Sequence, residues 1–244
     1  MKENKYDDNI FFKKYSQFPR SKDGLSAAGE WHELKKLLPN FKNKRVLDLG
    51  CGFGWHCLYA YDQGADQVVG VDLSNKMLEV AKNKSIGKQI EYRNIAFEDV
   101  EFENDSFDVV ISSLALHYTK DFKLVCQKIN KWLSKGGTFV FSVEHPIFTA
   151  RAQQNWIYDE NNNIEYWPVD NYFQEDLRET LFLEEKIIKY HRTLATYLNT
   201  LLDCGFEIIA VVEPTPNEEL LSLVASMKDE LRRPMMLLVK CLKK

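Results

Sequence analysis

A glycine-rich turn directly after a short apolar segment is the feature that most constrains this chain. Residues 46–49 predict a buried strand, residues 50–54 carry glycine at every second position, and residues 55–62 predict a helix. Glycine lets the backbone adopt positive φ and approach a ligand closely. A helix N-terminus adds free N–H groups and a positive dipole end. The order therefore predicts a nucleotide-like ligand; the alternative, a tight turn without a ligand, is disfavoured because three glycines in five residues weaken packing.

An acidic residue at the end of the next strand supports this interpretation. Residues 68–71 predict that strand, and Asp72 follows it, 18 residues after Gly54. A carboxylate in this place can accept hydrogen bonds from both ribose hydroxyls. The GxGxxG spacing of dinucleotide-binding folds would need glycine at position 55, which is Trp55. A nicotinamide-dependent oxidoreductase is therefore disfavoured.

The chain alternates apolar strands with amphipathic helices, which predicts a parallel sheet covered on both faces. Further strands are expected at residues 90–94, 107–112, 138–143, 206–212 and 235–241, and helices at 26–38, 74–84, 122–133, 193–202 and 217–230. The fold class is therefore α/β, a doubly wound, mostly parallel seven-stranded sheet with an antiparallel edge strand. One domain, residues 1–244, is expected, with an N-terminal cap over 1–38 and a lid-like insertion over about 146–190.

Residues 46–54 resemble the first motif of the class I S-adenosylmethionine-dependent methyltransferases. The resemblance continues through residues 70–74, 107–112 and 133–143, in the family's order, and covers roughly residues 40–145. The small-molecule methyltransferases similar to quinone-biosynthesis enzymes are the nearest relatives in pattern. The resemblance implies S-adenosylmethionine as the cofactor and a methyl transfer as the reaction.

The resemblance also implies which residues hold the cofactor. The glycine loop faces the methionine part, Asp48 shapes that loop, and Asp72 holds the ribose. Ala96 stands where the family usually has an acid near the adenine, so the N–H of Phe97 or the side chain of Glu98 is expected to take over. The expected cofactor-binding residues are Asp48, Gly50, Cys51, Gly52, Gly54, Asp72, Leu73, Met77, Ala96, Phe97, Ser113 and Tyr15. Tyr15 lies, with Arg20, in the segment that closes over the cofactor in related enzymes.

Two histidines are candidates for a catalytic base. Methyl transfer to a nucleophile needs alignment of acceptor and methyl group, and sometimes removal of a proton. His117 follows the predicted fourth strand and His145 the fifth, and an ordinary imidazole, with a pKa of about 6.5, can accept a proton at neutral pH. A purely structural role remains the alternative for each.

The insertion is the remaining clue to the acceptor. Six large aromatic residues could wall a pocket for a planar or apolar molecule, or form a small core that anchors the loop: Trp156, Tyr158, Tyr166, Trp167, Tyr172 and Phe173. His191 and Arg192 could pair with an anionic substrate group or stand on the solvated surface.

Composition narrows the function classes. The formal net charge is -4, so a nucleic-acid partner is not expected. The five cysteines show no CxxC pair, so no metal site is expected, and neither a secretory signal nor a run of about 18 apolar residues occurs. These features predict a cytoplasmic enzyme that methylates O, N or C of a small molecule. A non-catalytic cofactor-binding sensor or partner subunit is the alternative, and an RNA or protein acceptor remains open.

Overall fold

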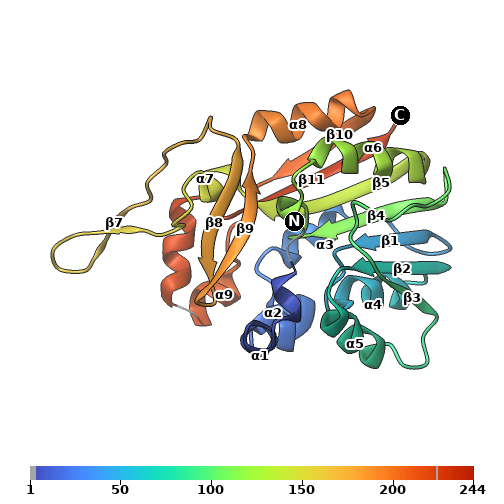
Figure 1. The fold of residues 1–244 in the computed structure, drawn as a ribbon, viewed down its shortest axis with the longest axis horizontal. Helices are drawn as coiled ribbons and strands as arrows, with labels where there is room; N and C mark the ends of the chain where they lie inside the picture. The colour runs from blue at the N-terminus through green and yellow to red at the C-terminus, as the bar shows by residue number, and fades with distance from the viewer. Residues whose placement is uncertain (1–3, 224) are drawn as a thin grey trace.

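The computed structural model describes residues 4–223 and 225–244, and its centre is a seven-stranded sheet of order β10-β11-β5-β4-β1-β2-β3 (Figure 1). The strands are β1 Arg45–Leu49, β2 Gln67–Asp72, β3 Ile90–Asn94, β4 Phe107–Ser113, β5 Leu133–Glu144, β10 Phe206–Val212 and β11 Met236–Lys243. The predicted fold class is confirmed. Each expected strand of the sheet is present, with ends within a few residues of the expected ones.

The antiparallel strand lies one place inside the edge. β11 pairs antiparallel with β5 on one side and with β10 on the other, so the edge strand β10 runs parallel to the remaining strands. The crossover from β5 to β10 leaves a gap one strand wide, and the last strand of the chain fills it by running back. Residues 238–242 of β11 then pair with a neighbouring strand on both sides, which satisfies their buried backbone N–H and C=O groups.

Helices cover both faces of the sheet. On one face α6 Phe122–Trp132 and α8 Leu194–Asp203 pack against Leu47, Val110 and Phe141. On the other face lie α3 Trp31–Leu37, α4 Trp55–Asp62 and α5 Asn75–Lys84, against residues such as Val46 and Val109. Neighbouring strand residues thus face opposite layers, and both are buried, as a parallel sheet requires.

Two helix predictions differ from the structure in their extent. The helix expected over 26–38 is only α3, preceded by the short 3-10 turn η2 Gly24–Ala27. The helix expected over 217–230 is α9 Glu218–Leu223 followed by the 3-10 segment η4 Ala225–Arg232. The helix expected over 74–84 is α5, and Ser74 caps it, because its Oγ accepts a hydrogen bond from the N–H of Met77 at 3.2 Å.

Two further segments lie at the carboxyl ends of the strands (Figure 1). The first precedes the sheet and contains η1 Lys5–Asp7, α1 Asn9–Ser16 and α2 Pro19–Lys22. The second follows β5 and contains α7 Pro146–Thr149 and two hairpins: β6 Ile157–Tyr158 with β7 Ile164–Tyr166, and β8 Asp176–Phe182 with β9 Glu185–His191. Within residues 4–223 and 225–244 no helix is both long and apolar enough to cross a bilayer.

Candidate functional site

A cavity of about 600 Å³ lies over the carboxyl ends of β1, β2 and β4. Its floor is the glycine loop, and its walls come from the N-terminal segment, the tip of the β8–β9 hairpin, residues 214–216 and the start of β11. This volume and place are those of a cofactor and small-molecule site in an open α/β sheet.

The three glycines of the loop serve different purposes. All have positive φ, at 73° for Gly50, 51° for Gly52 and 74° for Gly54. A Cβ on Gly50 would stand 2.3 Å from the Cβ of Ala115, and one on Gly54 would stand 2.6 Å from Oη of Tyr92. Gly50 and Gly52 line the cavity together with Cys51. Gly54 does not: it begins α4 and packs against the sheet, so the structure does not place it at the predicted ligand.

Asp72 faces the cavity with both carboxylate oxygens fixed. Oδ2 accepts from the N–H of Gly52 and Oδ1 from the N–H of Ser74, each at 2.8 Å. Burial raises the pKa of Asp72 to about 6, while the two N–H donors act to lower it. Each oxygen keeps a lone pair for a further donor. The group is therefore built to accept two hydroxyls, as a ribose offers.

Asp48 lies behind the loop and does not line the cavity. Its side chain is buried, and Oδ2 accepts from Sγ of Cys57 at 3.4 Å. Burial raises the pKa of Asp48 to about 7. Among the described residues its Oδ1 has no hydrogen-bond partner. Asp48 thus supports the loop from below, in agreement with the shaping role that the family resemblance implies.

The residues expected around the adenine come together beyond β2 and β3. Leu73, Met77, Ala96 and Phe97 all line the cavity, and so does Glu98. The first two follow β2 and the others follow β3, and these strands are neighbours in the sheet. Ser113 and Tyr15 line the cavity as well.

His117 lines the cavity, but it acts there as a hydrogen-bond donor. Its Nδ1 accepts a hydrogen bond from the N–H of Glu144 at 3.4 Å. Burial lowers the pKa of His117 to about 4, so the ring is neutral at neutral pH. In a neutral imidazole whose Nδ1 accepts, Nε2 carries the hydrogen. His117 therefore presents an N–H group, which does not support the prediction that it removes a proton.

His145 is buried outside the cavity-lining residues. It caps α7, because its Nδ1 accepts from the N–H of Ile147 at 3.0 Å, and its Nε2 stands 2.8 Å from Oε1 of Glu213. Adjacent residues at the end of β5 point in opposite directions, so Glu144 faces the cavity and His145 does not. The placement argues against His145 as the base and assigns it a structural role.

A buried ion pair in the cavity wall was not predicted from the sequence. Nζ of Lys189 lies 2.6 Å from Oε1 of Glu144, and Nε2 of Gln154 donates to Oε2 of Glu144 at 2.9 Å. The Lys189 ammonium and the hydrogen bonds hold the pKa of Glu144 below its ordinary value against the effect of burial. The sequence carried one signal: Lys189 alternates with Ile187 and His191 on the buried face of β9.

The tip of the β8–β9 hairpin and the N-terminal segment close over the cavity. The ring of Phe182 packs against Phe11, Tyr15 and Phe18 at centroid distances of 6.0, 6.5 and 5.7 Å. Tyr15, Phe18 and Phe182 also line the cavity. These aromatic residues form its roof.

Polar contacts fasten the roof at both ends. Lys5 and Lys14 form ion pairs with Glu185 and Glu184 of the hairpin, at 3.0 and 2.5 Å. On the other side Asp7 accepts from Oγ of Ser74 at 2.6 Å, beside the start of α5. The N-terminal segment therefore bridges α5 and the hairpin across the cavity.

The six aromatic residues of the insertion do not line this cavity. Trp167 stacks on Phe148 at 5.2 Å and meets Trp156 edge-on at 5.1 Å, and the guanidinium of Arg233 lies 4.1 Å from the Trp167 ring centre. This small core anchors the loop. The interpretation of these aromatics as a pocket wall is therefore not supported, and Phe182, which the sequence did not single out, takes that place.

His191 and Arg192 are buried and do not line the cavity, so they lie neither at a substrate group nor on the solvated surface, the two places expected for them. His191 bonds Oγ1 of Thr149 at 2.7 Å, and Arg192 donates to the carbonyls of Thr119 and Lys120 at 2.5 and 2.8 Å. They fasten the insertion to the sheet. Among the described residues no group of three or more His, Cys, Asp or Glu side chains is arranged to hold a metal ion.

Comparison with known proteins decides the family. A model described as a methyltransferase domain matches residues 47–141. A solved S-adenosylmethionine-dependent methyltransferase of Mesorhizobium loti is 41% identical, with a TM-score of 0.84, over 90% of this chain and 100% of that one. A solved Listeria monocytogenes protein, assigned to the same enzymes, is 54% identical with a TM-score of 0.86, over 91% and 99% of the two chains.

This chain belongs to the S-adenosylmethionine-dependent methyltransferases. The ubiquinone biosynthesis O-methyltransferase of Idiomarina loihiensis is also similar, at 39% identity over 102 residues, which are 41% of this chain and 42% of that one. The methyltransferase cavity fits its cofactor: Leu73, Met77 and Phe97 offer apolar surface to an adenine, and the two oxygens of Asp72 can each accept a hydrogen bond from a hydroxyl. Buried polar atoms without a partner among the described residues, Oε2 of Glu30 and Nε1 of Trp55, line the same cavity.

Proposed function

We propose that this methyltransferase acts on a small molecule that binds under the roof, next to the glycine loop. The observation that carries the proposal is one continuous cavity, which joins the expected cofactor residues to the part lined by Phe18, Phe182 and Met236. A site closed by a fastened N-terminal segment and a hairpin suits an acceptor that enters whole. An RNA or a protein would need an open groove at the point of transfer.

The wall of the acceptor part favours an apolar body with one polar group. Phe18, Leu25, Phe182, Met235 and Met236 supply apolar surface. The polar group would meet a second set of lining residues, namely His117, Glu144 and Lys189. The likeness to a ubiquinone biosynthesis O-methyltransferase is in keeping with such an acceptor.

The donors in this wall favour an oxygen acceptor. Lys189 carries an ammonium group and His117 an N–H, while the oxygens of Glu144 are already bound by Lys189 and Gln154. Two donors without a free base favour an oxygen that arrives already ionised, such as a phenolate or a carboxylate, because its methylation needs no proton transfer to the protein. Bound S-adenosylmethionine supplies an electrophilic methyl group on a sulfonium. The chain then needs to hold the acceptor oxygen in line and exclude water, and the roof does the latter.

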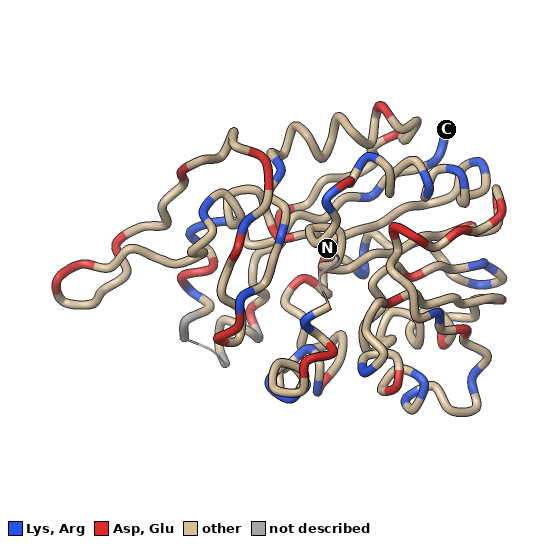
Figure 2. Tube along the Cα trace, in the orientation of Figure 1, with Lys and Arg blue, Asp and Glu red and all other residues tan. Residues whose placement is uncertain are grey.

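Charge distribution and cysteine chemistry support the rest of the proposal. Figure 2 shows basic and acidic residues interspersed along the chain, and the formal net charge is -4. Neither feature favours a polyanionic acceptor. The five cysteines are free thiols, which fits the reducing cytoplasm as the place of action.

The test is the destination of a labelled methyl group. The protein is incubated with methyl-labelled S-adenosylmethionine and, in separate reactions, with a metabolite extract, total RNA and total protein. We expect label in the metabolite reaction, and clearly less there with the Asp72→Asn variant as control at a limiting cofactor concentration. Label transferred to RNA or protein, with the metabolite reaction blank, would contradict the proposal.

A further inference from the structure

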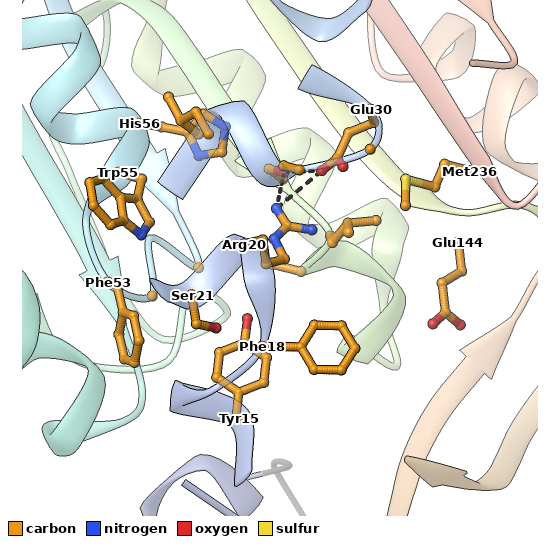
Figure 3. A pocket seen from close by; sticks show the side chains of 18 of the residues that line it. Tyr15, Phe18, Arg20, Ser21, Glu30, Phe53, Trp55, His56, Glu144 and Met236 are labelled. Carbon is orange, nitrogen blue, oxygen red and sulfur yellow. Dashed lines mark hydrogen bonds and ion pairs between the residues drawn. The ribbon is translucent and has the colours of Figure 1, made fainter. Parts of the chain in front are cut away.

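The acceptor part of the cavity contains a buried ammonium group with one N–H to spare. In Figure 3 the carboxylate of Glu144 lies on the same side of the cavity as Met236, whereas Trp55, which follows the glycine loop, lies on the opposite side. Nζ of Lys189 donates to Oε1 of Glu144 at 2.6 Å and to Oε1 of Gln154 at 3.4 Å. An ammonium group carries three N–H bonds, so one is left for a ligand.

His117 supplies a second donor in the same part of the cavity. Its Nδ1 accepts from the N–H of Glu144 at 3.4 Å, so the ring hydrogen is on Nε2. Among the residues that the structure describes, none accepts a hydrogen bond from this Nε2. Burial lowers the pKa of His117, and Glu144 and Lys189 come next in effect, with opposite signs, because both lie near the ring. The three side chains therefore form one polar cluster with two available donors.

The acids next to these donors are already bound to cations or donors. Oε1 of Glu144 accepts from Lys189, and its Oε2 accepts from Nε2 of Gln154 at 2.9 Å. Glu230, which also lines the cavity, accepts from both terminal nitrogens of Arg233 at 2.9 and 3.1 Å. Neither carboxylate is free to take a proton from an acceptor.

The other titratable groups of the wall are no better placed as a base. Asp72 and Glu98 line the part expected to hold the ribose and the adenine. Glu30 is paired with Arg20 at 3.1 Å. Burial lowers the pKa of His56 to about 4, so its ring does not hold a proton taken from an ordinary hydroxyl. The acceptor must therefore bring a nucleophile that is already deprotonated.

Acceptor groups differ in whether they meet this condition. A carboxylic acid, with a pKa of about 4, is almost fully ionised at pH 7, whereas a phenol, with a pKa of about 10, is ionised to about one part in a thousand. An alkyl ammonium group loses its proton just as rarely. A phosphate monoester arrives ionised, but it brings about −1.5 to −2 charges to a cluster in which Glu144 already balances Lys189. A carboxylate brings a single charge and two oxygens.

We propose that the group methylated is a carboxylate and that the product is a methyl ester. This inference rests on the proposed function and names the acceptor group. Lys189 and His117 hold one carboxylate oxygen, which leaves the other free to attack the methyl group in line. The new C–O bond forms as the S–CH₃ bond of the cofactor breaks, the electron pair of the broken bond stays on sulfur, and no proton is transferred.

The linkage of the transferred methyl group tests the proposal. The protein is incubated with methyl-labelled S-adenosylmethionine and a metabolite extract, and the labelled product is separated from unreacted cofactor and treated with dilute alkali. A methyl ester hydrolyses to methanol, which is volatile and is collected from the vapour. Methyl ethers, N-methyl groups and C-methyl groups stay in solution. We expect most of the label to appear as methanol.

Three variants test the residues. His117→Asn keeps an oxygen near the position of Nδ1 for the N–H of Glu144 and removes the Nε2–H. The double variant Glu144→Gln with Lys189→Met removes the ammonium group without leaving a buried unpaired charge. Lys186→Met is the matched control, because Lys186 lies on the same strand β9 and pairs with Glu179, and its side chain is 71% exposed.

Ester formation is measured at saturating cofactor with diluted extract. It should fall about fivefold in His117→Asn and more than tenfold in the double variant, as loss of a neutral and of a charged hydrogen bond to the acceptor predicts. Both should bind S-adenosylhomocysteine as the wild type does in isothermal titration, and Lys186→Met should match the wild type in both assays. The wild-type rate should change less than about twofold between pH 7 and pH 8, whereas an acceptor that must ionise would gain about tenfold.

The failures are distinguishable. If no label enters a small molecule, the proposed function fails and this inference fails with it. Label that stays in solution after alkali, or a tenfold rise in rate per pH unit, would overturn the inference and leave the proposed function standing. Full ester formation in both variants would remove His117 and Lys189 from the acceptor site. A loss of rate that only parallels a loss of S-adenosylhomocysteine binding would overturn their assignment as well.

Discussion

Asp72 gives the sharpest quantitative prediction, because its two oxygens are held in place and its pKa is shifted. We consider Asp72→Asn, which keeps the size of the side chain and removes its charge. An amide has one acceptor oxygen, so it cannot accept from Gly52 and Ser74 and also serve two ribose hydroxyls. One or both ligand hydrogen bonds are therefore lost.

The magnitude follows from the charge on the carboxylate. A hydrogen bond to a charged group contributes about 1.5–3 kcal/mol, so loss of one bond weakens S-adenosylhomocysteine binding by roughly tenfold to 150-fold, and loss of both by roughly a hundredfold or more. The pH dependence adds a second signature. Burial raises the pKa of Asp72 to about 6, and the ionised form is the one that accepts both hydroxyls. Wild-type affinity should therefore fall as the pH drops below about 6, approaching tenfold per pH unit.

The assay is isothermal titration with S-adenosylhomocysteine at pH 5, 6 and 7.5. Wild type should lose affinity towards pH 5, and Asp72→Asn should be weak and nearly independent of pH over this range. An Asn variant within twofold of the wild type at pH 7.5 would refute the ribose assignment. Equal pH slopes for the two proteins would refute the role of the Asp72 charge.

Three other predictions concern the stability of the fold and the role of His145. Burial raises the pKa of Asp48 to about 7, so the folded state holds this proton more tightly than the unfolded chain, and stability should fall as the pH rises from about 4 to 7. Because Asp48→Asn does not titrate, its free energy of urea unfolding should rise relative to wild type by on the order of 1–4 kcal/mol between pH 5 and pH 8. Equal pH slopes for the two proteins would speak against this. Gly54→Ala puts a Cβ 2.6 Å from Oη of Tyr92 at a φ of 74°, and should lower the free energy of unfolding by about 1–3 kcal/mol. An unchanged melting temperature in thermal unfolding would mean that the loop relaxes freely. His145→Ala should cost about 1 kcal/mol through loss of the α7 cap and leave turnover per bound cofactor unchanged in the labelled-methyl assay; a selective loss of turnover would restore His145 as a catalytic candidate.

The glycine loop and Asp72 could be predicted from the sequence, because their positions depend on short stretches of backbone. Gly50, Gly52 and Asp72 line the cavity as expected, since a strand that ends in a glycine turn dictates its own φ values and N–H directions. The seven strands and their mostly parallel arrangement followed from the alternation of apolar segments with amphipathic helices. The same local reasoning placed Ser74 at the start of α5.

Side-chain direction decided which of the predicted bases reaches the cavity. His145 and Glu144 are neighbours in the sequence, yet only Glu144 lines the site. His117 does line it, but its burial and the N–H of Glu144 make it a donor. These outcomes depend on the exact end of β5 and on what covers it, and no pattern of residue types records that.

Contacts between distant segments account for the rest. Glu144 meets Lys189 from the inserted hairpin, Arg20 meets Ser113 at the end of β4, and Phe182 closes the roof on α1. Such pairs form only when loops of variable length have packed, and their energies come from burial and charge that the unfolded chain does not possess. The sequence by itself determined the strands of the sheet, the glycine loop and the place of Asp72 beside that loop, because hydrophobic period and glycine spacing are local. The tertiary structure alone decided the roof, the charged walls and the fate of each histidine, because those depend on which distant side chains exclude water together.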